Sequence, residues 1–186
     1  MNNLLMAIGV ATVLTLSGVR NVSAQDAPVI EKDGVFYVGV QSPTTVSAFG
    51  ASAGELIWSS NLADLCPSGR LHPAVAKDVV YVGCETSSGG GVGALIAATG
   101  QVLWYTTLEA AVYSAPSPQK SALYVGSQLG VAALDAATGA VQWVTLLGAV
   151  TSSPAVQKGV VYVGTDDDLT ALDATTGQIL YQSVAP

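Results

Sequence analysis

Apolar and polar residues alternate along this chain in short runs that are separated by turn residues. Near the C-terminus four such runs follow one another, at residues 153–156, 160–164, 169–173 and 178–182. The turns between them fall at residues 158–159, 166–168 and 176–177. Strict alternation is typical of half-buried strands, and glycine at the turns tolerates a positive φ. No window after the N-terminal segment has a convincing helical period, so the pattern predicts an all-β chain of hairpins.

The same set of four strands occurs four times. The tripeptide Tyr-Val-Gly marks each copy, and its final glycines are spaced 44, 43 and 38 residues apart, at Gly39, Gly83, Gly126 and Gly164. A second glycine marks each copy at Gly54, Gly100, Gly139 and Gly177. Four residues beyond it lies an aromatic residue: Trp58, Trp104, Trp143 or Tyr181. A repeat of about 40 residues with four strands is the spacing of a propeller blade. The predicted blades are residues 28–60, 72–106, 115–145 and 153–183.

The third copy carries a specific motif. Its residues 133–143 match Ala-x-Asp-x-x-Thr-Gly-x-x-x-Trp at all five defining positions, which are Ala133, Asp135, Thr138, Gly139 and Trp143. The fourth copy keeps Asp173, Thr176 and Gly177 but ends in Tyr181. The second copy has Ile96 in place of the acid and keeps Trp104, and the degenerate first copy keeps Trp58.

In these residues the chain resembles the pyrroloquinoline-quinone (PQQ)-like repeat family, whose tryptophan-docking motif they match. The resemblance covers residues 28–182 and implies a β-propeller of four-stranded antiparallel blades. Four repeats make either a half-propeller or a small propeller. The tryptophans then pack between blades, and the Asp and Thr side chains hold the turn before the last strand. We expect these residues to be structural, with Trp143 the best buried of the indoles.

The first 24 residues differ from the rest. An uncharged apolar run from Leu4 to Leu16 precedes Val22-Ser23-Ala24, which has small residues where a signal peptidase cleaves. This predicts a secretory signal peptide over residues 1–24 and a soluble, periplasmic or secreted domain over residues 25–186. A retained membrane anchor is the alternative, although the run is short for a span. In an oxidising compartment we expect Cys66 and Cys84, the two cysteines, to form a disulfide.

Composition narrows the classes of partner. Half of the residues are hydrophobic, 10% are charged, and the formal net charge is −7. Because an acidic surface repels phosphate backbones and anionic lipid heads, we expect no nucleic-acid ligand, and we expect no membrane-embedded segment after cleavage of the signal peptide.

Three groups of side chains in the variable loops are candidates for chemistry. Asp166, Asp167 and Asp168 offer oxygen ligands to a metal ion but lack the spacing of a calcium loop. Arg70 and the single histidine, His72, could hold an anion near Cys66. The pair Ser152-Ser153 has no nearby histidine base in the sequence. We therefore predict no metal site and no catalytic residue, and the cofactor-binding residues remain unassigned.

The resemblance implies two functions. The family includes PQQ-dependent dehydrogenases and a propeller that serves β-barrel assembly in the outer membrane. The chain lacks the vicinal cysteine pair and the clear set of calcium ligands of the dehydrogenases. We therefore expect a non-enzymatic binding or scaffold module without a cofactor, which contacts a protein partner through its loop face or associates with itself. The alternative is a remnant or subunit of a quinoprotein alcohol or sugar dehydrogenase that uses PQQ with calcium.

Overall fold

The computed structural model describes residues 29–67, 69–166 and 168–184 as four sheets, each of four antiparallel strands. Blade one comprises β1 (Val29–Lys32), β2 (Val35–Gln41), β3 (Thr44–Gly50) and β4 (Leu56–Asn61). Blade two comprises β5 (Arg70–Ala76), β6 (Val79–Thr86), β7 (Gly89–Ile96) and β8 (Val102–Leu108). Blade three comprises β9 (Ser117–Gln119), β10 (Ala122–Ser127), β11 (Gly130–Asp135) and β12 (Val141–Leu146). Blade four comprises β13 (Ala155–Gln157), β14 (Val160–Gly164), β15 (Asp168–Asp173) and β16 (Ile179–Val184).

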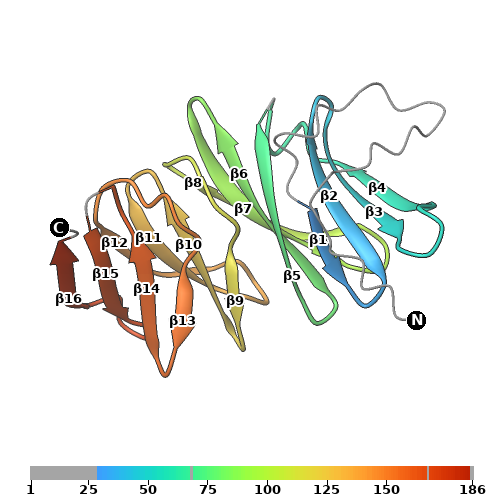
Figure 1. Cartoon of the computed structure of the whole chain (residues 1–186). Helices are drawn as coiled ribbons and strands as arrows, with labels where there is room; N and C mark the ends of the chain where they lie inside the picture. Colours follow the sequence, from blue (N-terminus) through green and yellow to red (C-terminus); the bar gives the residue numbers. More distant parts are fainter. Residues whose placement is uncertain (1–28, 68, 167, 185–186) are drawn as a thin grey trace, which may run out of the picture.

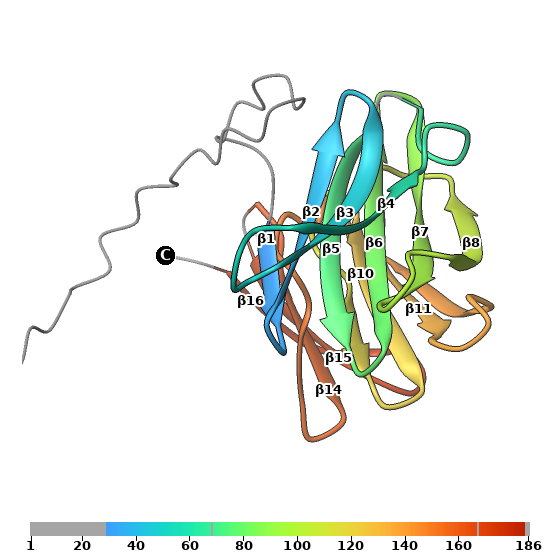
Figure 2. The same cartoon turned by 90° about the vertical axis from the view of Figure 1, so that its right-hand side faces the viewer.

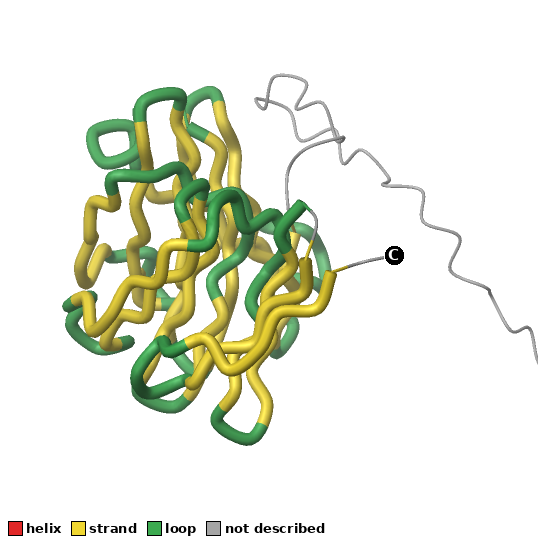
Figure 3. The backbone as a smooth tube through the Cα atoms, turned by 90° about the vertical axis from the view of Figure 1, so that its left-hand side faces the viewer, coloured by secondary structure: helices red, strands yellow, loops and turns green. Residues whose placement is uncertain are grey.

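The blades stand in a row, with blade one and blade four at opposite ends (Figure 1). Seen from the blade-one end, the other blades lie behind it (Figure 2). The first strands of successive blades contact each other, β1 with β5, β5 with β9 and β9 with β13. Every described segment is a strand or a loop (Figure 3). The predicted β-propeller of four-stranded antiparallel blades is thus confirmed.

A bulge recurs at the same place in every blade. The register between the third and fourth strands shifts at Ala48/Phe49, Ala94/Leu95, Ala133/Leu134 and Ala171/Leu172. In blade three, for example, Ala133 pairs with Trp143 and Leu134 pairs with Val141, so Gln142 is the extra residue. A bulge bends its strand and re-aims the following side chain. A small, fully buried alanine stands opposite each aromatic residue, which leaves room for the ring on that face.

The hydrophobic core lies between the blades. Three clusters of buried residues each join one blade to the next, because both faces of an interior blade must be covered. The last glycine of Tyr-Val-Gly lies where the following linker approaches. A Cβ on Gly83 would be 2.6 Å from Val112 Cγ1, and one on Gly126 would be 2.7 Å from Val150 Cγ1. This close approach explains why glycine recurs at that position of the repeat.

Three details of the fourth copy differ from the sequence prediction. The last strand was expected at residues 178–182 but occupies 179–184. The first strand was expected at residues 153–156 but occupies 155–157, because the Ser152 hydroxyl accepts a hydrogen bond from the Gly164 N–H ahead of the strand. Asp168 was expected in a turn but begins β15, where it pairs with Val184. Its backbone N–H donates to Thr165 Oγ1, so the turn is closed by Thr165 instead. The predicted signal peptide lies outside the described residues.

Candidate functional site

The tryptophans connect neighbouring blades through one recurring hydrogen bond. Each indole Nε1 donates to the backbone carbonyl of an alanine in the next blade: Trp58 to Ala97 (2.8 Å), Trp104 to Ala136 (3.3 Å) and Trp143 to Ala174 (3.2 Å). The hydroxyls of Tyr81 and Tyr124 donate to two of these same carbonyls, at 3.3 and 3.0 Å. Because the tyrosine and tryptophan rings of a blade also pack against each other, with centroids about 6 Å apart, they form one docking unit.

Two further contacts complete each docking unit. A hydroxyl two residues after the tryptophan donates to the carbonyl of the turn glycine: Ser60 to Gly100, Thr106 to Gly139 and Thr145 to Gly177. Each glycine has a positive φ of 72–73° and lies against the indole. A Cβ on Gly177 would be 2.5 Å from Trp143 Cε3. The sequence analysis did not assign the acceptor alanines or these hydroxyls, although both recur at fixed offsets from the tryptophan.

The motif aspartates act within their own turn. Asp135 Oδ1 accepts hydrogen bonds from the backbone N–H groups of Ala137 and Thr138 and from the Thr138 hydroxyl, at 2.9–3.0 Å. Asp173 makes the same three bonds with Thr175 and Thr176. The pKa of the Asp135 carboxyl lies below its ordinary value because the Thr138 hydroxyl and N–H stabilise the charged form. Neither aspartate contacts another blade in these bonds, so both are turn residues.

The expectation that Trp143 is the best-buried indole is wrong. Trp58, in the degenerate first copy, is 9% exposed, whereas Trp104 and Trp143 are half-buried. The reason lies in the linker between blades one and two. Leu62 and Cys66 of this linker are buried in the same cluster as Trp58 and add apolar atoms to that interface.

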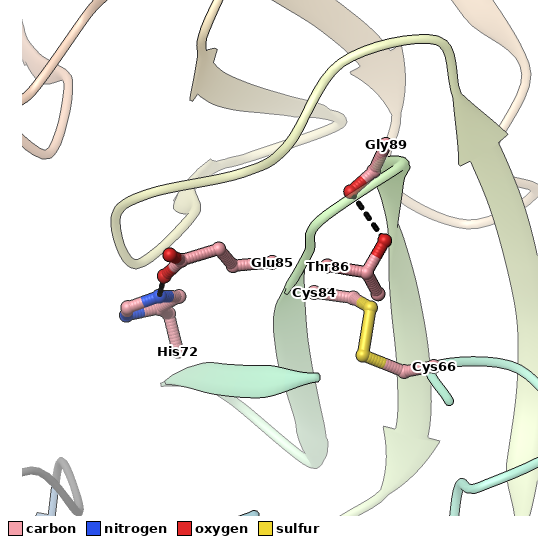
Figure 4. A network of polar contacts seen from close by, with 6 residues as sticks. All are labelled: Cys66, His72, Cys84, Glu85, Thr86 and Gly89. Atoms are coloured by element: carbon pink, nitrogen blue, oxygen red, sulfur yellow. Dashed lines mark hydrogen bonds and ion pairs between the residues drawn. A yellow bond between two sulfur atoms is a disulfide. The ribbon is translucent and has the colours of Figure 1, made fainter. Parts of the chain in front are cut away.

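The linker between blades one and two is attached by a disulfide. Cys66 and Cys84 are bonded, with their Cα atoms 6.0 Å apart, and both are 1% exposed. Cys84 lies in β6 and pairs with Leu71 of β5 in the register. The linker therefore folds back onto the end of blade two, as Figure 4 shows.

Beside this disulfide lies the histidine. His72 Nε2 is 3.3 Å from Glu85 Oε2, and the two side chains point toward each other (Figure 4). Burial lowers the pKa of His72 below its ordinary 6.5, although Glu85 opposes that shift. Arg70 is the register partner of Glu85 on the neighbouring strand. Arg70 and His72, the candidate anion ligands, therefore both have the acidic Glu85 as a neighbour.

The other loop candidates do not come together as a site. Within the described ranges, no cluster of three or more His, Cys, Asp or Glu side chains could hold a metal ion. Asp166 is exposed and Asp168 lies in β15, while Asp167 is outside the described residues. Ser152 bonds the Gly164 N–H and Ser153 is exposed.

The loop face is formed by the linkers between blades and by the turns between second and third strands, and backbone hydrogen bonds brace it. The linker between blades two and three bonds to both of them, since the Val112 N–H donates to Cys84 O and the Gln128 N–H donates to Ala111 O. The linker between blades three and four does the same: the Val150 N–H donates to Ser127 O and the Thr151 N–H to Gly164 O. Such bracing holds the loops in fixed positions relative to the blades.

Large apolar side chains are exposed on this loop face. Leu129 is 48% exposed at the turn between β10 and β11, and Leu146 is 72% exposed at the end of β12. The two positions are adjacent, because the Leu147 N–H donates to Leu129 O at 3.1 Å. Leu65, in the disulfide-bonded linker, is 37% exposed. Loops held on a rigid scaffold are a common location of binding residues, so these exposed leucines are candidates for contact with a partner.

Comparison with known families agrees with this geometry. The family described as outer membrane protein assembly factor BamB matches residues 42–185. The chain belongs to this family. No curated protein sequence gives a significant match. Within the described ranges, the BamB-type chain has no helix long and apolar enough to cross a membrane.

Solved structures show the same fold at low sequence identity. BamB from Moraxella catarrhalis is 21% identical, with a TM-score of 0.66 over 83% of this chain and 51% of that chain. Quinohemoprotein alcohol dehydrogenase from Comamonas testosteroni is 20% identical, with a TM-score of 0.70 over 86% and 34%. The computationally designed Ika4 protein is 15% identical, with a TM-score of 0.63 over 85% and 89%. The chain thus spans about half the length of that BamB and about a third of the dehydrogenase.

The acidic side chains of the described residues form no grouped ligand set for the calcium that would accompany PQQ. The described carboxylates are not grouped as metal ligands, and the disulfide joins residues 18 positions apart within a packed core. A calcium ion needs six to eight oxygen ligands, and the described acidic side chains do not supply a group of three.

Proposed function

We propose that this chain is a non-enzymatic binding module that works outside the cytoplasm and holds a protein partner on its loop face. The observation that carries the proposal is the pair of exposed leucines, Leu129 and Leu146, on loops braced by both neighbouring blades. Apolar side chains on loops braced by backbone hydrogen bonds lose less entropy on binding than those on unbraced loops, which favours recognition of another protein.

The assignment of the other conspicuous residues supports a binding role. The tryptophans, the motif glycines and the acceptor carbonyls all connect one blade to the next, and the aspartates hold their own turns. The rigid part of the molecule is therefore a scaffold, and the side chains left for recognition are those of the loops.

The proposed compartment is supported by the pairing of Cys66 and Cys84. A buried disulfide within the core of an interface persists in oxidising surroundings, and together with the expected signal peptide it supports a periplasmic or secreted protein. The BamB-type description of the family names an assembly factor of the outer membrane. We propose the same kind of role for this chain, as a scaffold that holds a component of an envelope assembly.

Site-specific photo-crosslinking in the native host tests the proposal. A photoreactive residue at exposed Gln128, beside Leu129, should give one discrete adduct with another protein, and Leu146→Asp should abolish that adduct. Lys158, exposed in the turn between β13 and β14, is the matched position away from the loop face and should give none. Equal adducts from both positions, or an adduct that survives Leu146→Asp, would contradict a loop-face partner.

A second measurement distinguishes the scaffold from a dehydrogenase subunit. Purified protein incubated with PQQ and calcium should show neither a bound chromophore nor dye-linked oxidation of alcohols. Either signal would contradict the proposed scaffold role and would indicate a quinoprotein.

A further inference from the structure

Each internal blade interface consists of two complementary halves. The donor half is an aromatic residue on the fourth strand together with a hydroxyl two residues later, such as Trp58 and Ser60. The acceptor half is the carbonyl of an alanine and, three residues later, a glycine in the turn of the next blade, such as Ala97 and Gly100. The three internal interfaces all use this arrangement.

Blade four carries a donor half that faces no other blade among the described residues. Tyr181 occupies the tryptophan position and is 48% exposed, and Ser183 follows at the hydroxyl position. Leu169 is 46% exposed, whereas its register equivalents Val46, Val92 and Val131 are fully buried against a neighbouring blade. Tyr124, the equivalent of Tyr162 in blade three, donates its hydroxyl to the Ala174 carbonyl of the next blade.

Blade one carries the matching acceptor half. Ala51 and Gly54 stand where Ala97 and Gly100 stand in blade two, and the φ of Gly54 is +69°, against +72° for Gly100. Ala51 is exposed, so its turn lacks the covering that the other turns receive.

Beside this turn one aromatic side chain is exposed and a second is half-buried. Phe36 is 37% exposed, and it is paired in the register with half-buried Phe49. Val80 and Leu95, their equivalents in blade two, are 0% and 1% exposed. Blade one and blade four stand at opposite ends of the row (Figure 1). The exposed residues give blade one an apolar acceptor face and blade four an apolar donor face.

We propose that two copies of this chain associate head to tail, so that blade four of each copy docks on blade one of the other. Tyr181 and Ser183 of one copy then bond the carbonyls of Ala51 and Gly54 in its partner, as Trp58 and Ser60 bond blade two within the chain. A second copy is the occupant that fits both ends, because each end carries the half that the opposite end needs.

The share of longer propeller chains that this chain covers indicates two copies. The chain superposes on about half the length of BamB, with a TM-score of 0.66, and on 48% of the designed Ika8 protein, with a TM-score of 0.68. Two copies of this chain together therefore have about the length of one such propeller chain. Head-to-tail contacts close into a ring when the rotation allows, and closure covers both exposed faces at once.

The test is a pair of variants at the two ends, measured by sedimentation equilibrium on the exported chain at micromolar concentrations. The parent should have the mass of a dimer. Tyr181→Asp and Ala51→Glu should each weaken association by about 30-fold or more, the effect of losing a hot spot at an interface. Leu180→Asp is the matched control, since Leu180 is 51% exposed and aligns with the residue before each tryptophan, so it should leave the dimer intact.

Mixing the two variants makes the test specific for head-to-tail pairing. Tyr181→Asp keeps an intact Ala51 and Ala51→Glu keeps an intact Tyr181, so an equimolar mixture should recover dimers held by one native interface. Circular dichroism should show the parent's strand content in both variants. A monomeric parent, a dimer insensitive to both substitutions, a mixture that does not recover dimers, or an assembly larger than two copies would each overturn the proposal.

Discussion

The interface between blades one and two and the interface between blades three and four reach the same geometry from different sequences. At the latter the motif is complete, and Asp173 braces the turn that receives Trp143. At the former Ile96 replaces the aspartate, yet the indole bond from Trp58 is the shorter of the two, 2.8 Å against 3.2 Å.

The difference shows which parts of the motif make the interface. The indole, the acceptor carbonyl and the turn glycine occur in both, so these three define how blades stack. The aspartate is a local support that blade two lacks. Blade two instead has a disulfide-bonded linker whose Leu62 and Cys66 bury Trp58. Covalent attachment and extra apolar burial accompany the less complete motif.

The largest expected effect is the loss of Trp58. Trp58→Ala should lower the free energy of unfolding by about 3–5 kcal/mol, the usual cost of truncating a buried large aromatic residue. Trp143→Ala should cost less because that indole is half-buried. Urea unfolding of the three proteins measures both values. A greater loss for Trp143→Ala would reverse our ranking of the two interfaces.

Removal of the disulfide should cause the next largest loss in the free energy of unfolding. The Cys66→Ala/Cys84→Ala variant should lose about 3 kcal/mol, because the closed loop no longer restricts the unfolded chain. Hydrogen exchange should accelerate over residues 62–71 and remain unchanged at β14. Thiol titration of the unfolded, unreduced parent should detect no free cysteine, and two free thiols would contradict the bond.

The docking glycine should be more sensitive than a turn glycine. Gly177→Ala should cost about 2–3 kcal/mol, since it combines a strained positive φ with a clash against Trp143. Gly159→Ala is the control: its φ is +80°, but a Cβ there meets nothing within 4 Å. It should cost only the backbone strain, about 1 kcal/mol. Equal losses would mean that the indole does not press on the glycine.

The smallest expected effect is a change in how much stability the protein loses in acid. The pKa values of Asp135 and Asp173 lie below the ordinary 3.8 in the folded chain, so the unfolded chain takes up protons first as the pH falls. The two carboxylates therefore stabilise the folded chain fully at pH values above 3.8. This contribution to the free energy of unfolding is lost as the pH falls through the lowered pKa of the folded state. Asp135→Asn/Asp173→Asn should therefore lose less stability than the parent between neutral pH and about pH 3.

Blade two offers the reciprocal experiment. Ile96→Asp places a carboxylate three residues before Thr99. The charged carboxylate should raise the free energy of unfolding at neutral pH, and this gain should be lost when acid protonates it. Urea unfolding at the two pH values compares all three proteins. Identical acid responses would show that the turn bonds do not stabilise the aspartate anion.

Much of this fold could be predicted because its signals are local. Alternation of apolar residues, the repeated Tyr-Val-Gly and the turn glycines specify hairpins whose strands are joined by short turns, and the family's motif places the aromatic residue four positions after its glycine. The pairing of Asp135 with Thr138 also follows from sequence, since the two are three residues apart.

Only the tertiary structure decided how the blades meet. The indole bonds join residues 39, 32 and 31 positions apart, and which carbonyl accepts them depends on the angle between sheets. The same holds for the greater burial of Trp58 and for Glu85 as the partner of His72. The sequence by itself determined the strands and their repeat, because turn chemistry acts over a few residues. Packing across blades determined the rest, because it depends on distances that no local pattern encodes.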